Sequence, residues 1–306
     1  MPKAQVTSAV RWLRYRRPME VHRFDDATSF RETAMAYLVA DEARHNLLLG
    51  ISTTLIEKPD LYELVDLWAV LDGDEVVLAA LRTPPHNLVL GGPSREGALQ
   101  RLTDRLLEEG QDLPGIVAAI PEVDAFVAAW TAASDLDAIL VLREGIYQLT
   151  DVLDVPQAPG IHRPADRSDR DLVVRWMLAF GEEALPQDVE VERQTRLIEA
   201  RLDATDASGL WLWVVDGEPV SMSGYGGATP NGIRIGPVYT PPDLRGRGYG
   251  TSLVASQSRW LLEAGRSFVF LYTDLDNPTS NALYRRIGYR MVAEASEVRF
   301  DRLAIA

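Results

Sequence analysis

Six consecutive residues, rich in glycine and arginine, form the part of the sequence best suited to hold a negatively charged ligand. Residues 245–250 read Arg-Gly-Arg-Gly-Tyr-Gly, between an apolar run at 232–240 and an amphipathic run at 248–264. Glycine lets a ligand approach the backbone closely. The first N–H groups of a helix are unpaired, so a helix that begins here would attract an anion. Arg245 and Arg247 add two positive charges, and we therefore expect this turn to bind a phosphate or a diphosphate.

Other ligands of glycine-rich loops fit this segment less well. No Gly-Lys-Ser or Gly-Lys-Thr follows it, as a nucleotide P-loop would require. It does not open a βαβ unit at the start of the chain with an acidic residue about 20 residues later, as a dinucleotide site would. A nucleic-acid patch is a further alternative. Two arginines without a flanking basic run, in a chain with a formal net charge of −14, disfavour it.

A second pattern follows the apolar run at 268–273. Asn277 is suited to cap a helix, Pro278 suits the first helical position, and Gly288 suits the position just after the last turn. Asn277 and Tyr284 are seven residues apart, which places them two helical turns apart on the same face. The pattern predicts a short helix that presents an amide and a phenol to one ligand.

Both motifs lie in the second of two halves that follow the same order of elements. Each half has a helical part, a hairpin with Asp-Gly at its turn, a strand, a helix that ends at glycine, an apolar strand, a short helix and final strands. The hairpin turns are at 72–73 and 216–217, the helices end at Gly110 and Gly265, and the apolar strands span 115–120 and 267–273. We interpret this order as an internal duplication.

The domain boundaries follow from length and composition. A chain of 306 residues predicts two domains of about 150 residues each. Two prolines and a glycine at 154–160 interrupt the periodic pattern, and they separate expected domains at 19–154 and 161–306 with a linker at 155–160. Residues 1–18 contain basic side chains and no acidic one, and we expect a flexible basic extension there.

Composition excludes several classes of function. The chain contains no cysteine, and its four histidines are scattered, so we expect no disulfide and no metal site. It has no apolar run long enough to span a membrane and no secretory signal, which predicts a cytoplasmic protein with no membrane partner. The acidic net charge disfavours a nucleic-acid partner or an anionic membrane surface.

The order of strand, Arg-Gly-Arg-Gly-Tyr-Gly, helix, strand and Asn-x6-Tyr-x3-Gly-Tyr resembles the core of the GNAT superfamily of acyl-CoA-dependent N-acyltransferases. The close match covers 232–290, and the preceding hairpin and helices extend it over the second half. The first half resembles a degenerate copy, as in tandem GNAT proteins. The resemblance implies an α+β fold of two tandem domains, each with a mixed, mostly antiparallel central sheet flanked by helices.

The resemblance also implies an acetyl-CoA site and a mechanism of direct attack in a ternary complex. The turn would hold the diphosphate, a splayed strand end would pair with the pantetheine arm, and a backbone N–H near Val238 would polarise the thioester carbonyl. Asn277 would contact the pantetheine or the diphosphate, and Tyr284 would assist departure of the thiolate, by a hydrogen bond or by proton donation. The implied cofactor-binding residues are Val238, Tyr239, Thr240, Arg245, Gly246, Arg247, Gly248, Tyr249, Gly250, Asn277 and Tyr284.

The acceptor side is less defined. An alkyl amine with a pKa near 10.4 is only about 0.04% neutral at pH 7, so it needs a base or a desolvating pocket. Some GNAT members carry a carboxylate on the strand before Val238, but residues 232–238 contain no acid here. Candidate bases lie after the first helix of the second half, with Glu183 as the catalytic candidate, and the alternative is a solvated acidic face. These candidates are Glu182, Glu183, Asp188 and Glu190, while Glu182, Trp213 and Tyr225, together with Trp211, are candidates for the acceptor pocket unless the aromatic residues belong to the core.

The first half lacks the ligand-binding pattern. Its turn at 90–95 reads Leu-Gly-Gly-Pro-Ser-Arg, where Pro93 removes a backbone N–H, and 124–130 contains neither tyrosine nor asparagine. We expect this half to be structural. The sequence predicts an N-acetyltransferase that acts on a small-molecule or peptidyl amine, as a monomer or homodimer. A non-catalytic acyl-CoA sensor, or a tandem enzyme of small-thiol biosynthesis similar to mycothiol synthase, is the alternative.

Overall fold

The computed structural model describes residues 18–302, apart from 93–94, 185–197, 200 and 203–204. All but the last residue of the expected extension at 1–18 lies outside the described residues. The candidate bases Asp188 and Glu190 also lie outside them.

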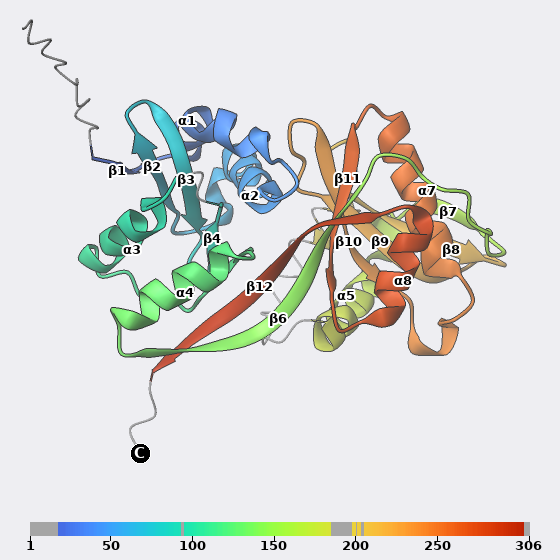
Figure 1. Ribbon diagram of the computed structural model, residues 1–306. Helices are drawn as coiled ribbons and strands as arrows, with labels where there is room; N and C mark the ends of the chain where they lie inside the picture. The colour runs from blue at the N-terminus through green and yellow to red at the C-terminus, as the bar shows by residue number, and fades with distance from the viewer. Residues whose placement is uncertain (1–17, 93–94, 185–197, 200, 203–204, 303–306) are drawn as a thin grey trace, which may run out of the picture.

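In the described residues of the first half, the strands form a sheet that has helices on both faces (Figure 1). In chain order these are β1 (Glu20–Arg23), α1 (Ala27–Ala40), α2 (Asn46–Glu57), the 3-10 turn η1 (Pro59–Leu61), β2 (Asp66–Asp72), β3 (Glu75–Arg82), β4 (Leu88–Leu90), α3 (Ala98–Glu108), β5 (Gly115–Ala119), α4 (Glu122–Ala132) and β6 (Leu136–Leu149).

The second half repeats this order, which confirms the expected mixed α+β fold with two GNAT-like units in tandem. Its elements are β7 (Ile161–Pro164), η2 (Arg167–Asp169), α5 (Arg170–Ala184), β8 (Gly209–Val215), β9 (Glu218–Gly226), β10 (Gly232–Tyr239), η3 (Pro242–Leu244), α7 (Tyr249–Glu263), β11 (Phe268–Asp274), α8 (Pro278–Ile287) and β12 (Arg290–Arg302).

Both Asp-Gly turns form the hairpins that the sequence predicts. Asp216 and Gly217 both have positive φ angles, +50° and +86°, and they connect β8 to β9, which pair antiparallel. Two central residues with positive φ match the twist of the flanking strands, and glycine adopts this conformation without strain.

The described strands join into one twelve-stranded sheet in the order β1-β2-β3-β4-β5-β12-β6-β11-β10-β9-β8-β7. The last strand of each half has crossed to the other half. β6, from the first half, pairs with β11, and β12, from the second half, pairs with β5. β6 and β12 also pair with each other, and they form the long ribbon that connects the two halves in Figure 1. The linker bounds at 155–160 stay a prediction.

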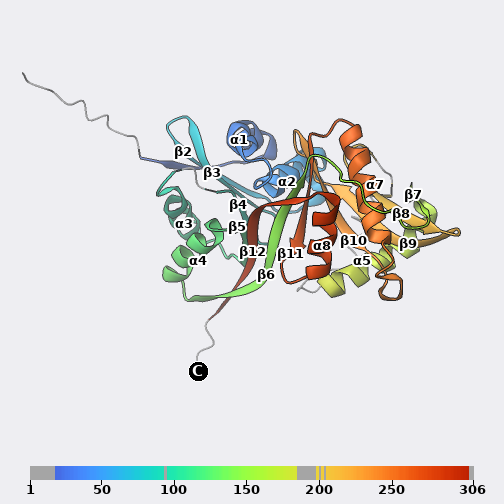
Figure 2. The ribbon, with the colours of Figure 1, turned by 45° about the vertical axis from the view of Figure 1, so that its right-hand side comes forward.

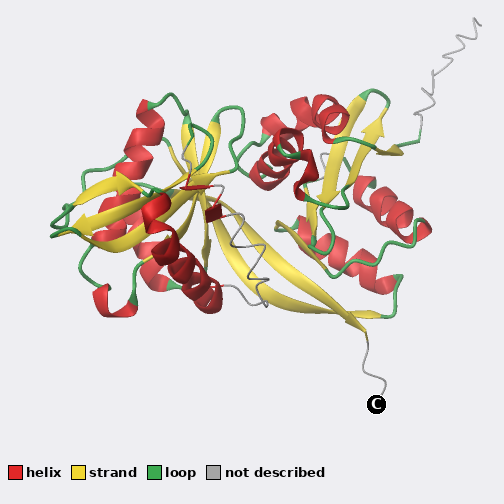
Figure 3. Ribbon diagram, turned by 180° about the vertical axis from the view of Figure 1, so that it is seen from behind, coloured by secondary structure: helices red, strands yellow, loops and turns green. Residues whose placement is uncertain are grey.

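Helices cover both faces of each half (Figures 2 and 3). In the second half, α7 and α8 pack on one face, around a core that includes Ile233 and Val269. α5 packs on the opposite face, over Leu212 and Met222. In the first half, α3 and α4 share one core and α1 and α2 share another. None of the described helices is long and apolar enough to cross a membrane.

The first half also contacts the turn that leads into β10. Glu42, after α1, accepts hydrogen bonds from the hydroxyl of Thr229 and from the backbone and side-chain N–H groups of Asn231. Gly50 of α2 packs so closely that an added Cβ would lie 3.2 Å from the Cα of Gly227. The start of β10 is therefore held against α2.

Candidate functional site

The centre of the candidate site is the point where β10 and β11 separate. The two parallel strands pair only at 232–234 with 268–270. Beyond these pairs β10 continues to Tyr239 and β11 to Asp274, but within the described residues no ladder joins them. β10 has an irregularity between Ile235 and Val238, where it pairs with β9. This separation leaves the inner edge of residues 235–239 free to pair with an extended ligand.

The glycine-rich turn has the conformation that an anion site needs. Gly246 and Gly248 have φ angles of +77° and +83°, and Gly248 precedes α7 without a side-chain cap on the helix. A Cβ at Gly246 would meet no atom within 4 Å, so this glycine is required by backbone conformation and not by lack of space. The first N–H groups of α7 are thus available to a ligand.

Arg245 is held in place by a carboxylate in the ligand-free structure. Its guanidinium donates to Glu183 Oε2 at 2.5 Å and to the backbone oxygen of Thr240 at 2.8 Å, and it lies 5.8 Å from the centre of the Tyr239 ring. Arg247 donates to the backbone oxygen of Asp243 at 3.1 Å. Glu183 therefore neutralises the arginine that is expected to hold the diphosphate.

The residues around the end of β10 are fixed by polar contacts and by an aromatic contact. The hydroxyl of Ser221 donates to the backbone oxygen of Tyr239 and lies 2.8 Å from the hydroxyl of Thr240. The Tyr239 ring packs at a tilt against Trp176 of α5, with 6.1 Å between the ring centres. Because both faces of the strand end are supported, the backbone near Val238 presents a rigid edge to the gap.

Tyr284 lies in the core beside the gap. It is 8% exposed and packs edge-on against Tyr289, and its hydroxyl makes no hydrogen bond to another described residue. Burial raises the pKa of Tyr284 to about 12. A simple thiol has a pKa of about 8.5, so complete proton transfer from this tyrosine to a thiolate would cost about 5 kcal/mol. With a thiolate placed at its hydroxyl, Tyr284 would therefore donate a hydrogen bond and not transfer its proton completely.

Two asparagines at the start of α8, Asn277 and Asn281, have different roles. Asn277 caps the helix by accepting a hydrogen bond from the backbone of Ser280 at 3.1 Å, and its side chain is exposed. Asn281 is buried and donates to the backbone oxygens of Asp274 and Asn277. It also accepts a hydrogen bond from the hydroxyl of Tyr147. Asn281 thus ties α8 to the end of β11, a role that the sequence analysis missed.

The acceptor candidates lie in two different environments. Trp213 and Tyr225 are buried in the core of the second half, where Trp213 donates to the backbone oxygen of Pro159 and Tyr225 to that of Thr205. Trp211 belongs to the same core and stacks on His162. Glu182 is exposed at the end of α5. The structure does not bring these residues together around one space.

Glu144 is a functional candidate that the sequence analysis missed. It lies on β6, opposite Asp274 at the end of β11 and opposite Ala295 of β12, and it is half-buried. Burial, together with the negative charges of Glu297 and Asp274, raises the pKa of Glu144 to about 7, against the opposing effect of Arg234. The only signal in the sequence is an acid within an apolar run of the first half, which says nothing about a site in the second.

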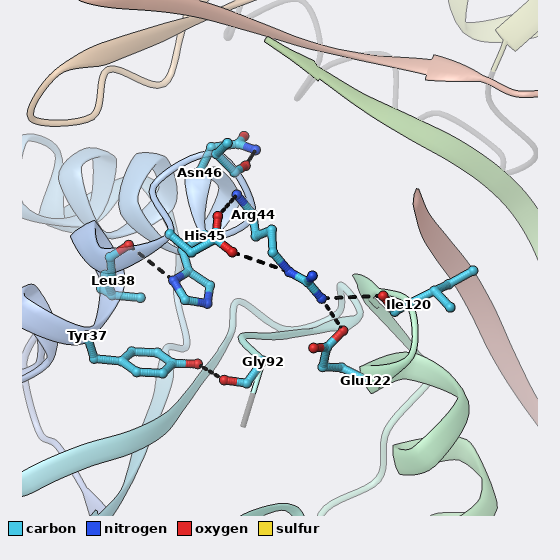
Figure 4. A network of polar contacts seen from close by, with 10 residues as sticks. Tyr37, Leu38, Arg44, His45, Asn46, Gly92, Ile120 and Glu122 are labelled. Atoms are coloured by element: carbon cyan, nitrogen blue, oxygen red, sulfur yellow. Dashed lines mark hydrogen bonds and ion pairs between the residues drawn. The ribbon is translucent and has the colours of Figure 1, made fainter. Parts of the chain in front are cut away.

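The corresponding gap in the first half is filled by side chains (Figure 4). β4 and β5 pair at 88–90 with 116–118 and then separate. The hydroxyl of Tyr37 donates to the backbone oxygen of Gly92, which follows β4. Arg44 donates to the backbone oxygen of Ile120, which follows β5, and pairs with Glu122. The remaining cavity, about 10 Å³, is no larger than one water molecule.

Within the ranges that the structure describes, no group of three histidine, aspartate or glutamate side chains is arranged to hold a metal ion.

Comparison with known proteins finds a family profile and similar sequences that match part of the second half. The acetyltransferase (GNAT) family profile matches residues 174–289. A mycothiol acetyltransferase from Arthrobacter sp. (strain FB24) is 40% identical over 58 residues, which cover 18% of this chain and 18% of that protein. The chain thus aligns with less than a fifth of this relative's length.

Solved structures match over nearly the whole chain. A GCN5-related N-acetyltransferase from Sphaerobacter thermophilus has a TM-score of 0.61 and 16% identity, and the match covers 94% of this chain and 97% of that one. A tandem GNAT protein from the clavulanic acid biosynthesis pathway has a TM-score of 0.53 and 14% identity, with 94% and 99% covered. At these identities the structures establish the fold alone.

Proposed function

Since the second half of this chain belongs to the acetyltransferase (GNAT) family, within a tandem GNAT-like fold, we propose that the protein transfers an acetyl group from acetyl-CoA to a primary amine. The observation that carries this proposal is the gap between β10 and β11. It has the uncapped N-terminus of α7 at its outer end and the side chain of Tyr284 beside it.

Acetyl-CoA binding would begin with an exchange of anions. The diphosphate takes the place of Glu183 on Arg245 and accepts hydrogen bonds from the first N–H groups of α7. The pantetheine arm pairs with the free edge of β10 between Val238 and Thr240. Arg247, Gly246, Gly248, Tyr249, Gly250 and Asn277 complete the proposed binding residues.

The chemical step is direct attack of a neutral amine on the thioester carbon. A C–N bond forms and negative charge develops on the carbonyl oxygen, where a fixed backbone N–H near Val238 stabilises it by about 3–4 kcal/mol. The C–S bond then breaks, and the thiolate accepts a hydrogen bond from Tyr284. The proton lost by the attacking nitrogen passes to a base.

Glu144 is the carboxylate best suited to be that base. A pKa of about 7 makes it a proton acceptor at neutral pH that can also release the proton again. Its neighbour Asp274 accepts a hydrogen bond from the backbone of Asp276 at 2.8 Å and is occupied in the turn after β11. Glu183, the base expected from the sequence, pairs with Arg245, which supports a role at the diphosphate site.

We further propose that the first half does not bind acetyl-CoA. Tyr37 and Arg44 donate hydrogen bonds to the backbone carbonyl groups that follow β4 and β5. A pantetheine arm would have to displace both side chains. The sequence of the turn, with Pro93 in place of a backbone donor, supports the same conclusion.

Calorimetric titration with acetyl-CoA tests the donor assignment. We expect one site per chain, and Arg245→Ala should weaken binding about 10- to 100-fold. Arg101→Ala on α3 of the first half is the matched control and should bind as the unmodified chain does. Two sites per chain would contradict the inactive first half, and no binding at millimolar acetyl-CoA would overturn the proposed function.

A mycothiol-type acceptor is a second candidate, favoured by the 40% identity to a mycothiol acetyltransferase over 58 residues. An acetyl-CoA sensor without turnover is the third. Release of coenzyme A in the presence of an amine panel separates an enzyme from a sensor, and the rank order within the panel separates the acceptors.

A further inference from the structure

Two arginines of the second half converge beside the gap. The terminal Nη2 of Arg201, on a short helical segment before β8, lies 3.7 Å from the position of a Cβ at Gly226. The Nη2 of Arg234, on β10, lies 3.4 Å from the position of a Cβ at Gly227. Because these two glycines are adjacent in the chain, both guanidinium groups lie over the same short stretch of backbone at the end of β9.

The two guanidinium groups lack a direct partner in the part of the chain that the structure describes. Among the residues that the structure describes, neither Arg201 nor Arg234 makes a hydrogen bond or ion pair, although both are partly buried. Burial lowers the pKa of Arg201 to about 10, and the positive charge of Arg234 lowers it as well. Two like charges held together away from water are unfavourable unless an anion lies between them.

Three other arginines of the second half are paired with carboxylates. Arg163 pairs with Asp169, Arg170 with Glu199, and Arg245 with Glu183. Arg201 and Arg234 form no such pair with a described carboxylate, although the charge of Arg234 acts on Glu144. An anionic ligand would supply the missing partner.

The position of the pair connects it to the acceptor side of the gap. Arg234 stands opposite Phe270 in the last ladder pair before β10 and β11 separate. Its neighbours Ile233 and Ile235 face the core under α7 and α8, so Arg234 points to the opposite face, away from the helix whose N-terminus forms the diphosphate site. Burial raises the pKa values of Glu144 and Tyr272, and the positive charge of Arg234 opposes this rise. Arg234, Glu144 and Tyr272 therefore lie on the same face.

We propose that Arg201 and Arg234 bind an anionic group of the acceptor, so that the substrate is an amine that also carries a carboxylate or a phosphate. The inference rests on the proposed function and specifies its acceptor. Such a substrate carries a charge at each end. Its ammonium group would contact the carboxylate of Glu144, and its anionic group would contact the guanidinium groups of Arg201 and Arg234. Guanidinium groups bind carboxylates and phosphates through paired, charge-assisted hydrogen bonds.

Matched amine panels test the proposal on the full chain with saturating acetyl-CoA. One panel contains α-amino acids and the same compounds as primary amides, and the other contains O-phosphoethanolamine and ethanolamine. We expect kcat/KM to be about 10- to 100-fold higher for the anionic member of the pairs in one panel or both. The panel with the larger ratio identifies the anion as a carboxylate or a phosphate.

Substitutions assign the preference to the two arginines. Arg234→Gln and Arg201→Gln should each raise KM for the anionic amine and reduce the ratio of kcat/KM between the anionic amine and its neutral partner. Arg234→Lys should retain part of the preference. Arg290→Gln, on the exposed start of β12, is the control and should change neither. Because Arg234→Gln relieves repulsion, its melting temperature should not fall, whereas a structural role would lower it.

Equal kcat/KM within every pair, or a preference for the neutral amines, would overturn the proposal. Turnover of no member of either panel would also overturn it. The donor assignment is judged separately by the calorimetric binding of acetyl-CoA. If the unmodified chain binds acetyl-CoA but turns over anionic and neutral amines with equal kcat/KM, the proposed function stands and the anion subsite is wrong.

Discussion

Tyr284 combines burial with a hydroxyl group that has no partner among the described residues, which suits a donor that acts only when a thiolate forms. We predict that Tyr284→Phe lowers kcat about 10- to 100-fold, because a hydrogen bond to a charged acceptor is lost. Acetyl-CoA binding should be unchanged by calorimetry. With a pKa of about 12 for Tyr284, its ionisation should not reduce kcat below about pH 11. Unchanged turnover at every pH would exclude Tyr284 from the chemical step.

Glu144 is predicted to set the acidic limb of the pH profile. The base must be ionised, so activity should rise with pH through a pKa of about 7 and fall below it. Glu144→Gln should remove this limb and lower kcat/KM, whereas Glu183→Gln should leave the limb in place and change acetyl-CoA affinity. A limb that persists in Glu144→Gln would show that another group is the base.

The same pKa shift predicts a change in stability with pH. Because the pKa of Glu144 is raised in the folded state, its carboxyl group binds a proton more tightly there than in the unfolded chain. Its effect on folding is therefore most favourable below the unfolded pKa of about 4.3 and is lost as pH rises through about 7. Glu144→Gln should melt higher than the unmodified chain at pH 8 and about equally at pH 4. A lower melting temperature at both pH values would indicate a structural role.

At the scale of elements, the turn before α7 can be tested by comparing two glycines, one at each end of the helix. Gly246 and Gly265 both have positive φ, +77° and +100°, and an added Cβ would meet no atom within 4 Å at either. Alanine at each position should therefore cost about 1 kcal/mol of stability from backbone strain alone. Only Gly246→Ala should also weaken acetyl-CoA binding, since Gly265 lies at the far end of α7. Equal affinities in calorimetry would argue against the turn as the diphosphate site.

The elements themselves were largely predictable because their signals are local. Asp216-Gly217 required a hairpin, Gly265 ended α7, and Pro278 began α8, each through the conformational limits of one or two residues. The expected fold class is confirmed, and the GNAT family profile matches residues 174–289 of the second half. The roles of Arg245, Tyr284 and the other predicted site residues stay predictions, although the structure provides the gap and the uncapped helix that those roles need.

What the sequence could not predict depends on contacts between distant segments. Glu144 belongs to the first half in sequence and to the sheet of the second half in space, because strand pairing across the molecule leaves no mark on local periodicity. Arg201 and Arg234 each look ordinary in sequence, and only the fold brings two unpaired cations together. The ion pair between Glu183 and Arg245 likewise joins residues 62 positions apart.

At the scale of the whole molecule, the exchange of β6 and β12 makes each half depend on the other. Without β6, residues 269–274 of β11 lose their antiparallel partner, and without β12, residues 115–119 of β5 lose theirs. Either isolated half would expose a long sheet edge, which favours aggregation. We therefore predict that residues 1–157 and 158–306 do not fold when they are produced separately.

Co-production of the two segments should restore the fold, because every strand pair of the intact sheet can then form between two chains. Circular dichroism and size-exclusion chromatography measure this directly, and acetyl-CoA binding should appear only in the reassembled pair. The dependence also explains how a first half with a filled gap contributes to the site: it supplies Glu144 through β6 and supports the start of β10 through α2. An isolated second half that is monomeric, folded and able to bind acetyl-CoA would contradict this view of the first half as part of the catalytic unit.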